Sequence, residues 1–405
     1  MISPRTLAHK IWQRFPPAWR REILFRLSSA FAPRPDRNPI IPPGAPVIVV
    51  GPLAAATGLG EWARLALQAF QTAGLDARGI DLSKALMQGA DFPQTAWREG
   101  RDAYGPGTLV LHINAPYVPL ALWLLGRRLV RGKKIIACWA WELPDIPADW
   151  RWGLPFAHEI WGLSRFTADA IARHTALPVK VTPLPVVKGE ASPPEARPWV
   201  KPKGVFAALT MFNMASGFTR KNPLGAVEAF KKAFGDDPGC MLLIKTVNGQ
   251  HYPEGLEELR RAIGDAANIR LMDKTFTAAE TSSLIEECDA VLSLHRAEGF
   301  GLVPAEAMRR GKPVVATGWS GNMDFMNAEN SCPVGYRLAP AHDPQRTYDH
   351  AAQNWAEPDT DEAAACLRRL RTDPAFAAKL GVRAAEDAEK LWNLETYAGY
   401  LTGKS

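Results

Sequence analysis

The sequence predicts an α/β protein of two doubly wound domains, each with a parallel sheet covered by helices. Short apolar, β-branched segments alternate with segments of helical periodicity along most of the chain. The 405 residues are about twice the usual length of one domain. The alternation stops at a proline-rich stretch, residues 188–204, and then starts again. Two Rossmann-like units joined by a linker are the most economical arrangement.

The first 40 residues form a basic amphipathic arm. They contain eight basic and two acidic residues, which accounts for the whole net charge of +6. Apolar residues at four-residue spacing predict two short helices separated by Pro16 and Pro17. Such an arm suits either an anionic membrane surface or packing on the protein's own body. A nucleic-acid reader is expected to carry positive charge on its folded body, so nucleic acid is not an expected partner.

Residues 41–190 predict the first domain. A strand from Pro46 to Val50 leads into a glycine- and alanine-containing loop, and residues 61–72 have helical spacing. Ser164 has the residue type of a helix N-cap. Further strands are expected at 108–113, 134–139, 159–163 and 179–183, and helices at 118–130 and 164–175.

The second domain is expected over residues 204–360, after a linker at 191–203. Its strands are expected at 205–210, 240–246, 269–273, 290–294 and 313–317, and its helices at 222–234, 253–264, 277–288 and 304–310. Residues 361–405 are rich in alanine and charge, which predicts helices that cross back to the first domain.

Composition restricts the compartment and the cofactors. The longest apolar run is roughly half of the ~20 residues that a membrane span needs, and arginines interrupt any signal-peptide core. The five cysteines occur singly, which indicates neither disulfides nor a zinc site and fits a reducing cytoplasm. Asp359 and Asp361 form a D-x-D pattern in a proline-flanked stretch, which we interpret as a helix cap.

The most informative segment contains two glutamates eight positions apart, Glu298 and Glu306. Between them, Gly299 and Gly301 let the backbone approach a ligand closely, and a helix that starts near Pro304 offers backbone N–H groups to an anion such as diphosphate. Glu306 is expected in the first turn of that helix, where a carboxylate can accept hydrogen bonds from ribose hydroxyls. Glu298 is expected at the carboxyl end of a strand, where open α/β sheets bind ligands.

This segment resembles a known family. The run from Glu298 to Met308, followed by Gly311-Lys-Pro-Val-Val-Ala-Thr317, is similar to the E-x7-E signature of retaining glycosyltransferases of the GT-B fold, the group called family 4. Arg220-Lys221-Asn-Pro223 resembles the family's basic element that contacts the donor diphosphate, and residues 139–147 and 161–164 resemble a bacterial subgroup. The resemblance implies two Rossmann-like domains that face each other across a cleft.

The resemblance also implies a reaction and its residues. A sugar would pass from a nucleoside diphosphate sugar to an acceptor hydroxyl with retention, without a metal or other cofactor. The implied catalytic residues are Glu298, Arg220 and Lys221. The implied donor-binding residues are Gly58, Gly60, Gly299, Phe300, Gly301, Leu302 and Glu306. Lys245 joins them on a separate ground: a lysine at the end of a buried strand needs a partner, and the donor diphosphate is the first candidate. The chain departs from many relatives at two positions. It has Ala215 where they carry an arginine, and it lacks a histidine that they carry on the strand that here ends in residues 138–141. Glu142 or His112 is expected to replace that histidine, although His112 fits a core position equally well.

The sequence therefore predicts a cytoplasmic glycosyltransferase of polysaccharide or glycolipid synthesis, with a saccharide or lipid-linked acceptor. The basic arm would place it at the inner face of the membrane. Two alternatives stay open: another GT-B activity, such as a sugar-nucleotide epimerase or phosphorylase, and a catalytically silent module that binds a sugar nucleotide or a membrane.

Overall fold

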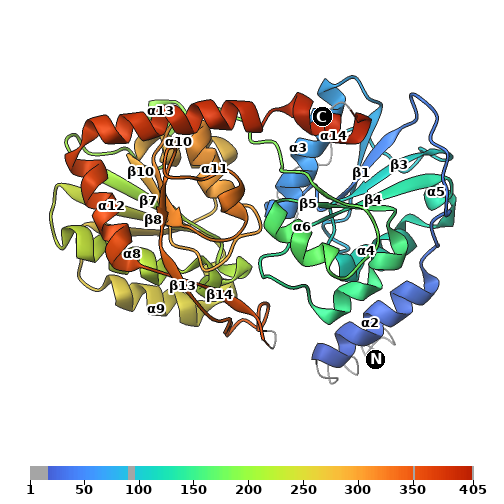
Figure 1. The fold of residues 1–405 in the computed structure, drawn as a ribbon, viewed down its shortest axis with the longest axis horizontal. Helices are drawn as coiled ribbons and strands as arrows, with labels where there is room; N and C mark the ends of the chain where they lie inside the picture. The colour runs from blue at the N-terminus through green and yellow to red at the C-terminus, as the bar shows by residue number, and fades with distance from the viewer. Residues whose placement is uncertain (1–16, 90–95, 350–351, 404–405) are drawn as a thin grey trace, which may run out of the picture.

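The computed structural model describes residues 17–89, 96–349 and 352–403. Two lobes lie side by side, and each is built around a six-stranded parallel sheet with helices on its faces (Figure 1). The predicted fold class, two Rossmann-like domains, is confirmed.

The first sheet has the strand order β2-β1-β3-β4-β5-β6. The second strand in this order, β1, is buried along its whole length and pairs in parallel with β2 and β3 on its two sides. Its strands are β1 (Val47–Gly51), β2 (Ala77–Asp81), β3 (Gly107–Leu111), β4 (Lys133–Trp139), β5 (Glu159–Gly162) and β6 (Val179–Val181). Its helices are α3 (Gly58–Thr72), α4 (Val118–Leu125), α5 (Arg127–Val130) and α6 (Arg165–Ala172).

Three details of the first domain differ from the sequence predictions. The helix expected at 118–130 is broken at Gly126, whose φ of +78° belongs to a conformation that favours glycine. Helix α3 begins at Gly58 rather than at Glu61, because the Thr57 side chain accepts a hydrogen bond from Gly60 N and caps the helix. Strand β2 was not expected. Ser164 caps α6, as predicted.

The second sheet has the strand order β12-β11-β10-β7-β8-β9. Strands β8 and β9 have the predicted bounds. The sheet contains β7 (Phe206–Met211), β8 (Cys240–Thr246), β9 (Ile269–Asp273), β10 (Ala290–Ser293), β11 (Val314–Thr317) and the unexpected β12 (Cys332–Val334). Its helices are α7 (Phe218–Lys221), α8 (Pro223–Phe234), α9 (Pro253–Ile263), α10 (Ala278–Glu287) and α11 (Leu302–Arg309).

The linker packs against the second domain. Trp199 is buried in a core cluster, Arg197 forms an ion pair with Glu287, and the Lys201 ammonium lies 2.5 Å from an Asp289 oxygen. The proline-rich stretch is therefore tied to the lobe that follows it.

An antiparallel hairpin, β13 (Tyr336–Pro340) and β14 (Asn354–Pro358), follows the second sheet and was not predicted. Arg296 holds it: its guanidinium donates two hydrogen bonds to the Glu357 carboxylate, at 2.7 and 2.9 Å, and its carbonyl accepts one from Ala356 N. The base of the hairpin is thus attached to Arg296, which stands two positions before Glu298 in the sequence.

The chain ends in three helices, α12 (Thr360–Thr372), α13 (Pro374–Leu391) and α14 (Leu394–Thr402). Helix α13 runs along the second lobe, and α14 lies on the first lobe beside α3 (Figure 1). There Tyr397 is buried, and its hydroxyl accepts a hydrogen bond of 2.8 Å from Trp62 Nε1. Asp359 caps α12 by accepting hydrogen bonds from Asp361 N and Glu362 N, so the interpretation of the D-x-D pattern as a cap is confirmed.

Helix α2 (Pro17–Phe31) is the second of the two helices expected in the arm, and the first lies outside the described residues. Phe25 is fully buried and packs edge-to-face against Tyr117. Among the described residues, none of the helices combines the length and the apolar character that crossing a bilayer requires.

Candidate active site

The residues implied as functional in the second domain follow the carboxyl ends of its strands. Arg220 and Lys221 lie on α7 after β7, Lys245 is the penultimate residue of β8, and Glu298 follows β10. Because parallel strands end at one edge of a sheet, these side chains gather there.

Arg220, Lys221 and Glu298 form one ionic cluster. The Lys221 ammonium donates to Glu298 Oε1, and Arg220 Nη1 lies 3.4 Å from Glu298 Oε2. Arg220 is only 3 % exposed, and its guanidinium also donates to the carbonyls of Ala297 (2.7 Å) and Ser216 (2.8 Å). The structure thus brings together the three residues implied as catalytic, around one carboxylate.

The charges in this cluster stabilise one another. Burial by itself would raise the pKa of Glu298, but the positive charges of Lys221 and Arg220 outweigh burial and lower this pKa to about 2. Burial lowers the pKa of Lys221, although Glu298 opposes that shift. Burial would also lower the pKa of Arg220, but Tyr348, Glu298 and Glu142 together raise it. Glu298 is therefore an anion at neutral pH.

Two side chains from other parts of the chain close over this cluster. Glu142, from the loop after β4 of the first domain, has a carboxylate oxygen 4.0 Å from Arg220 Nη2. Tyr348, from the loop of the β13–β14 hairpin, is buried, and burial together with the neighbouring Glu142 carboxylate raises the pKa of its hydroxyl. The Arg220 guanidinium lies 5.1 Å from the centre of the Tyr348 ring. Glu142 was one of two expected replacements for the absent histidine. Tyr348 was missed, since no motif in the sequence marks it.

The segment from Gly299 to Gly301, which we call the glycine loop, lies between the two domains. A Cβ on Gly299 would lie 3.1 Å from the Trp141 carbonyl oxygen, so this position needs glycine for close approach to the first domain. Gly301 has a φ of +97° and precedes α11, whose first residue is Leu302. Phe300 is buried against Phe325 and Trp392, so its side chain belongs to the core and only its backbone is part of the loop surface.

Glu306 belongs to a second group. Helix α11 begins at Leu302 rather than at Pro304, so Glu306 lies in the second turn and not in the expected first turn. Burial, followed by the neighbouring charge of Glu61, raises the pKa of Glu306 to about 7, and Arg310 and Lys245 oppose this rise. Glu61 stands in the first turn of α3, so this group also includes residues of both domains.

Lys245 was expected to need a partner. Burial lowers its pKa, while Asp273 and Glu306 counteract that shift, and its ammonium lies 5.7 Å from the centre of the Phe276 ring. These neighbours place a half-buried cation beside Glu306.

Gly58 and Gly60 lie in the first turn of α3, next to Glu61. A Cβ at Gly60 would meet the carbonyl oxygens of Ala55 and Pro52 at 2.4 and 2.6 Å, whereas a Cβ at Gly58 would meet nothing within 4 Å. Gly60 thus allows tight packing of the turn, and Gly58 borders open space.

His112 is a core histidine. It is fully buried against Trp62, neither ring nitrogen has a hydrogen-bond partner, and burial lowers its pKa to about 3. Of the two expected replacements for the absent histidine, only Glu142 lies beside the ionic cluster.

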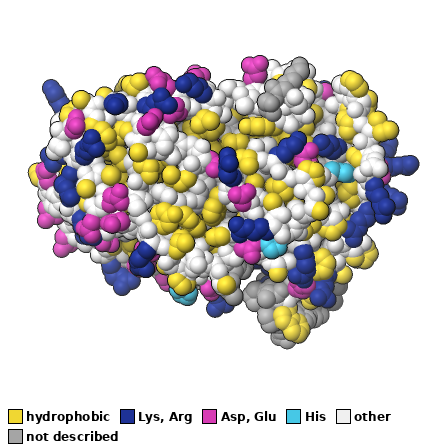
Figure 2. Space-filling view, viewed as in Figure 1, with side chains coloured by type: hydrophobic (Ala, Val, Ile, Leu, Met, Phe, Trp, Pro, Cys, Tyr) yellow, Lys and Arg dark blue, Asp and Glu magenta, His cyan; other side chains and the backbone are white. Residues whose placement is uncertain are grey.

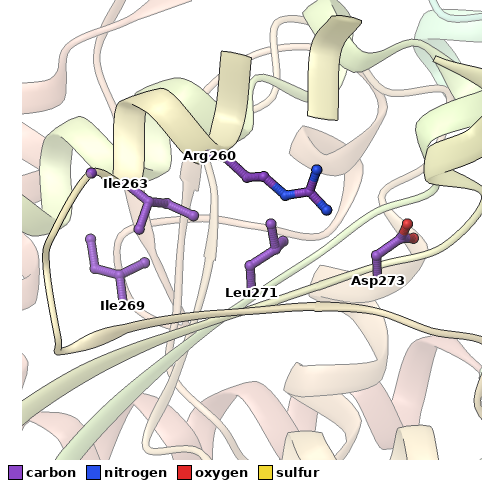
Figure 3. Close-up of a pocket in the computed structure, with 6 residues that line it drawn as sticks. Arg260, Ile263, Ile269, Leu271 and Asp273 are labelled. Carbon is purple, nitrogen blue, oxygen red and sulfur yellow. The ribbon is translucent and has the colours of Figure 1, made fainter. Parts of the chain in front are cut away.

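Possible metal sites and a surface pocket were the remaining places where a ligand could bind. Within residues 17–89, 96–349 and 352–403, no group of three or more His, Cys, Asp or Glu side chains is placed to hold a metal ion. A pocket of about 440 Å³ opens between α9 and the edge strand β9, where Arg260 and Asp273 flank Ile263, Ile269 and Leu271 (Figure 3). None of the implied site residues lines that pocket.

Comparison with known proteins gives one family and one fold. A family model described as "Family 4 Glycosyltransferase in conflict systems" matches residues 163–388. A trehalose synthase of Pyrococcus horikoshii is 31% identical over 100 residues, 24% of this chain and 24% of the relative. The chain thus matches about a quarter of that relative's length.

Solved structures match over most of the chain. HepE (Alr3699) of Anabaena, in complex with UDP and glucose, is 14% identical with a TM-score of 0.63, over 89% of this chain and 98% of that one. Sucrose-phosphate synthase of Thermosynechococcus elongatus is 16% identical with a TM-score of 0.64, over 88% and 97%. At such identities the likeness shows the fold, the facing Rossmann-like domains of the GT-B arrangement.

Proposed function

The chain belongs to the family 4 glycosyltransferases described from conflict systems, and from this premise we propose that it transfers a sugar from a nucleoside diphosphate sugar to an acceptor hydroxyl with retention of anomeric configuration. The observation that carries the proposal is the ionic cluster of Arg220, Lys221 and Glu298 beside the glycine loop. Two buried or half-buried cations at one carboxylate are suited to a diphosphate leaving group.

The proposed roles follow the chemistry of each group. Arg220, Lys221 and Lys245 stabilise the charge that develops on the diphosphate as the bond to the sugar breaks. Glu298 orients the transferred sugar, because it is anionic and lies next to these cations. Glu306 accepts hydrogen bonds from the ribose, and the backbone from Gly299 to Leu302 contacts the diphosphate at the start of α11.

In the proposed reaction the acceptor oxygen attacks the anomeric carbon on the face from which the leaving group departs. The bond from the anomeric carbon to the diphosphate oxygen breaks, and that oxygen takes the acceptor's proton. The new bond therefore keeps the configuration, and no side chain of the protein forms a covalent intermediate. The cations named above do the work of a metal ion, so we propose a metal-independent transfer.

The first donor to test is a UDP-sugar, because the HepE structure contains UDP and glucose. We propose a saccharide or lipid-linked acceptor and a role in cell-surface polysaccharide or glycolipid synthesis in the cytoplasm.

A thermal-shift screen with UDP-, GDP- and ADP-sugars tests donor binding, since a bound donor raises the unfolding temperature by mass action. The proposal predicts stabilisation by one nucleotide class, in the presence of EDTA as well as in its absence. Free nucleoside diphosphate should then form only when an acceptor hydroxyl is added. Epimerised donor without release of nucleoside diphosphate would support an epimerase instead, and donor binding without any turnover would support a silent binding module.

A further inference from the structure

Helix α2 and the end of α4 present large apolar side chains to solvent. Trp19, Leu27 and Phe31 on α2 are 64 %, 50 % and 64 % exposed. Trp123 and Leu124 on α4 are 47 % and 45 % exposed. The Phe31 and Trp123 rings stack with their centres 5.7 Å apart, so the two helices form one continuous apolar area. We call these five residues the α2–α4 surface.

This surface is not the face by which α2 attaches to the protein. The attachment uses Phe25, which is fully buried against Tyr117, and the buried Ser28. An ion pair of 2.7 Å between Arg21 and Asp149 holds the same helix to the first domain. Because α2 is already anchored by these contacts, Trp19 and Leu27 are not needed for its packing, and most of the Phe31 ring remains exposed although it stacks on Trp123. Exposed aromatic side chains of this kind typically mark an interaction site.

The charges around the surface indicate what covers it. Helices α2, α4 and α5 together carry five arginines and one glutamate. Arg127 follows the exposed Leu124 of α4 by three positions, and Arg127 and Arg131 are both exposed. Lysine and arginine side chains gather at the α5 end of the first lobe (Figure 2). Tryptophan and phenylalanine among arginines suit the boundary between lipid headgroups and acyl chains of an anionic bilayer.

We propose that the α2–α4 surface docks the protein on an anionic phospholipid membrane. The apolar residues enter the headgroup boundary, and arginines such as Arg127 and Arg131 attract the lipid phosphates. This proposal goes beyond the proposed function and does not depend on it, because the surface contains none of the residues assigned to sugar transfer.

The test is flotation of the full chain with vesicles of phosphatidylcholine and phosphatidylglycerol in a ratio of 7:3. The variant W19S/L27S/F31S should bind at least tenfold more weakly than the wild type. The matched control L338S/V382S changes side chains that are similarly exposed on the second lobe, at 57 % and 60 %, and should bind like the wild type. Thermal unfolding checks that each variant is folded, which is expected because every substituted side chain is exposed.

The role of charge is tested in the same assay. R127Q/R131Q should weaken binding at low salt, whereas the control R260Q/R270Q, at exposed arginines of the second lobe, should not. Vesicles of phosphatidylcholine alone should bind much less protein. Equal flotation of wild type and triple variant would overturn the proposal, as it would assign binding to another part of the chain. A wild-type dimer that the triple variant converts to a monomer, without vesicle binding, would instead make the surface a contact between two copies.

Discussion

Glu298 lies between two cations, and this arrangement is the basis for our first prediction. E298Q keeps the size of the side chain but removes the charge that Arg220 and Lys221 share. Because Glu298 is assigned to the transferred sugar and not to the nucleotide, kcat should fall by about tenfold or more while donor affinity changes little. Steady-state kinetics with varied donor, together with calorimetric donor binding, separate the two effects. Donor binding lost as completely as turnover would place Glu298 at the nucleotide instead.

The same carboxylate predicts a pH dependence of stability. Its pKa is lowered from 4.5 to about 2, so its ion pairs contribute fully above pH 4.5 and lose their contribution as pH falls toward 2. The difference in free energy of unfolding between wild type and E298Q should therefore be present at pH 7 and shrink on acidification. Urea unfolding at pH 7 and near pH 3 measures this difference, and a difference independent of pH would contradict the assigned ion pairs.

Glu306 has the opposite shift, since its pKa is raised to about 7. Its ionised form, which accepts stronger hydrogen bonds from ribose, should become populated as pH rises through 7. Donor affinity of the wild type should then rise between pH 6 and 8 relative to that of E306Q. E306A should weaken donor binding by about 1–3 kcal/mol at pH 8. The control E258Q, at an exposed carboxylate of α9, should retain the wild-type profile. Identical profiles for E306Q and wild type would remove Glu306 from the donor site.

Sequence reasoning found the residues of this site whose spacing forms a motif. The residues of the E-x7-E run and of the Arg220-Lys221 pair are close together in the sequence, so the sequence alone is enough to assign them to a strand end and a helix start. Tyr348 could not be found in this way, because its role depends on a hairpin that brings it to Arg220 across more than a hundred residues. The position of Glu306 in the second turn was also missed, since helix starts are set by backbone geometry at Gly301.

At the scale of elements, the β13–β14 hairpin connects the two halves of the site. Its loop places Tyr348 on Arg220 of the second domain and near the Glu142 carboxylate of the first, which helps to raise the pKa of the Tyr348 hydroxyl. Gln353, at the end of the same loop, accepts a hydrogen bond from Asp145 N in the first domain. The hairpin therefore orients Glu142 opposite the glycine loop.

This contact gives a prediction for Y348F and E142Q. Each should lower kcat/KM for the acceptor several-fold and leave donor affinity unchanged, because each loosens the position of Glu142. The double variant should be little worse than either single variant, since both substitutions disrupt the same contact between the two side chains. Y336F, at an exposed tyrosine of the same hairpin, is the matched control. Additive losses in the double variant would show that Tyr348 and Glu142 act separately.

The elements that sequence reasoning missed have a common physical cause. Strand β2 contains an arginine, a glycine and an aspartate, and β13 is largely exposed and ends in proline, so neither has the apolar pattern of a core strand. Arg296 and Glu357 fix the hairpin from sixty-one residues apart. Strand β8, which is buried over most of its length, was predicted with its correct bounds because its apolar pattern is local.

At the scale of the whole molecule, α13 and α14 link the lobes, and the Trp62–Tyr397 hydrogen bond fastens α14 to the first lobe. The glycine loop also touches the first domain at Trp141, so both lobes border the candidate site. Donor that binds between the lobes should draw them closer together, as hinged domains commonly close around a ligand. Small-angle scattering should show a smaller radius of gyration with saturating donor, whereas an unchanged radius would contradict closure.

A variant at the Trp62–Tyr397 contact tests whether this hydrogen bond holds α14 on the first lobe. Y397F removes the hydroxyl that accepts from Trp62 Nε1 and leaves that buried N–H without its partner, so the free energy of unfolding should fall by about 1–3 kcal/mol. The control Y400F changes a neighbouring, less buried tyrosine and should cost less. Urea unfolding measures both, and equal losses would show that the hydrogen bond does not secure α14.

The central claim is that this candidate site transfers a sugar from a nucleoside diphosphate with retention, and proton NMR of the product tests it most directly. The donor identified by thermal shift is incubated with its acceptor and EDTA, and the coupling constant of the new anomeric proton is followed together with release of the nucleoside diphosphate. We predict one nucleoside diphosphate released for each glycoside formed, an anomeric configuration identical to that of the donor, and formation of both products slowed by about tenfold or more with E298Q. A product of inverted configuration, or transfer undiminished in E298Q, would contradict the account.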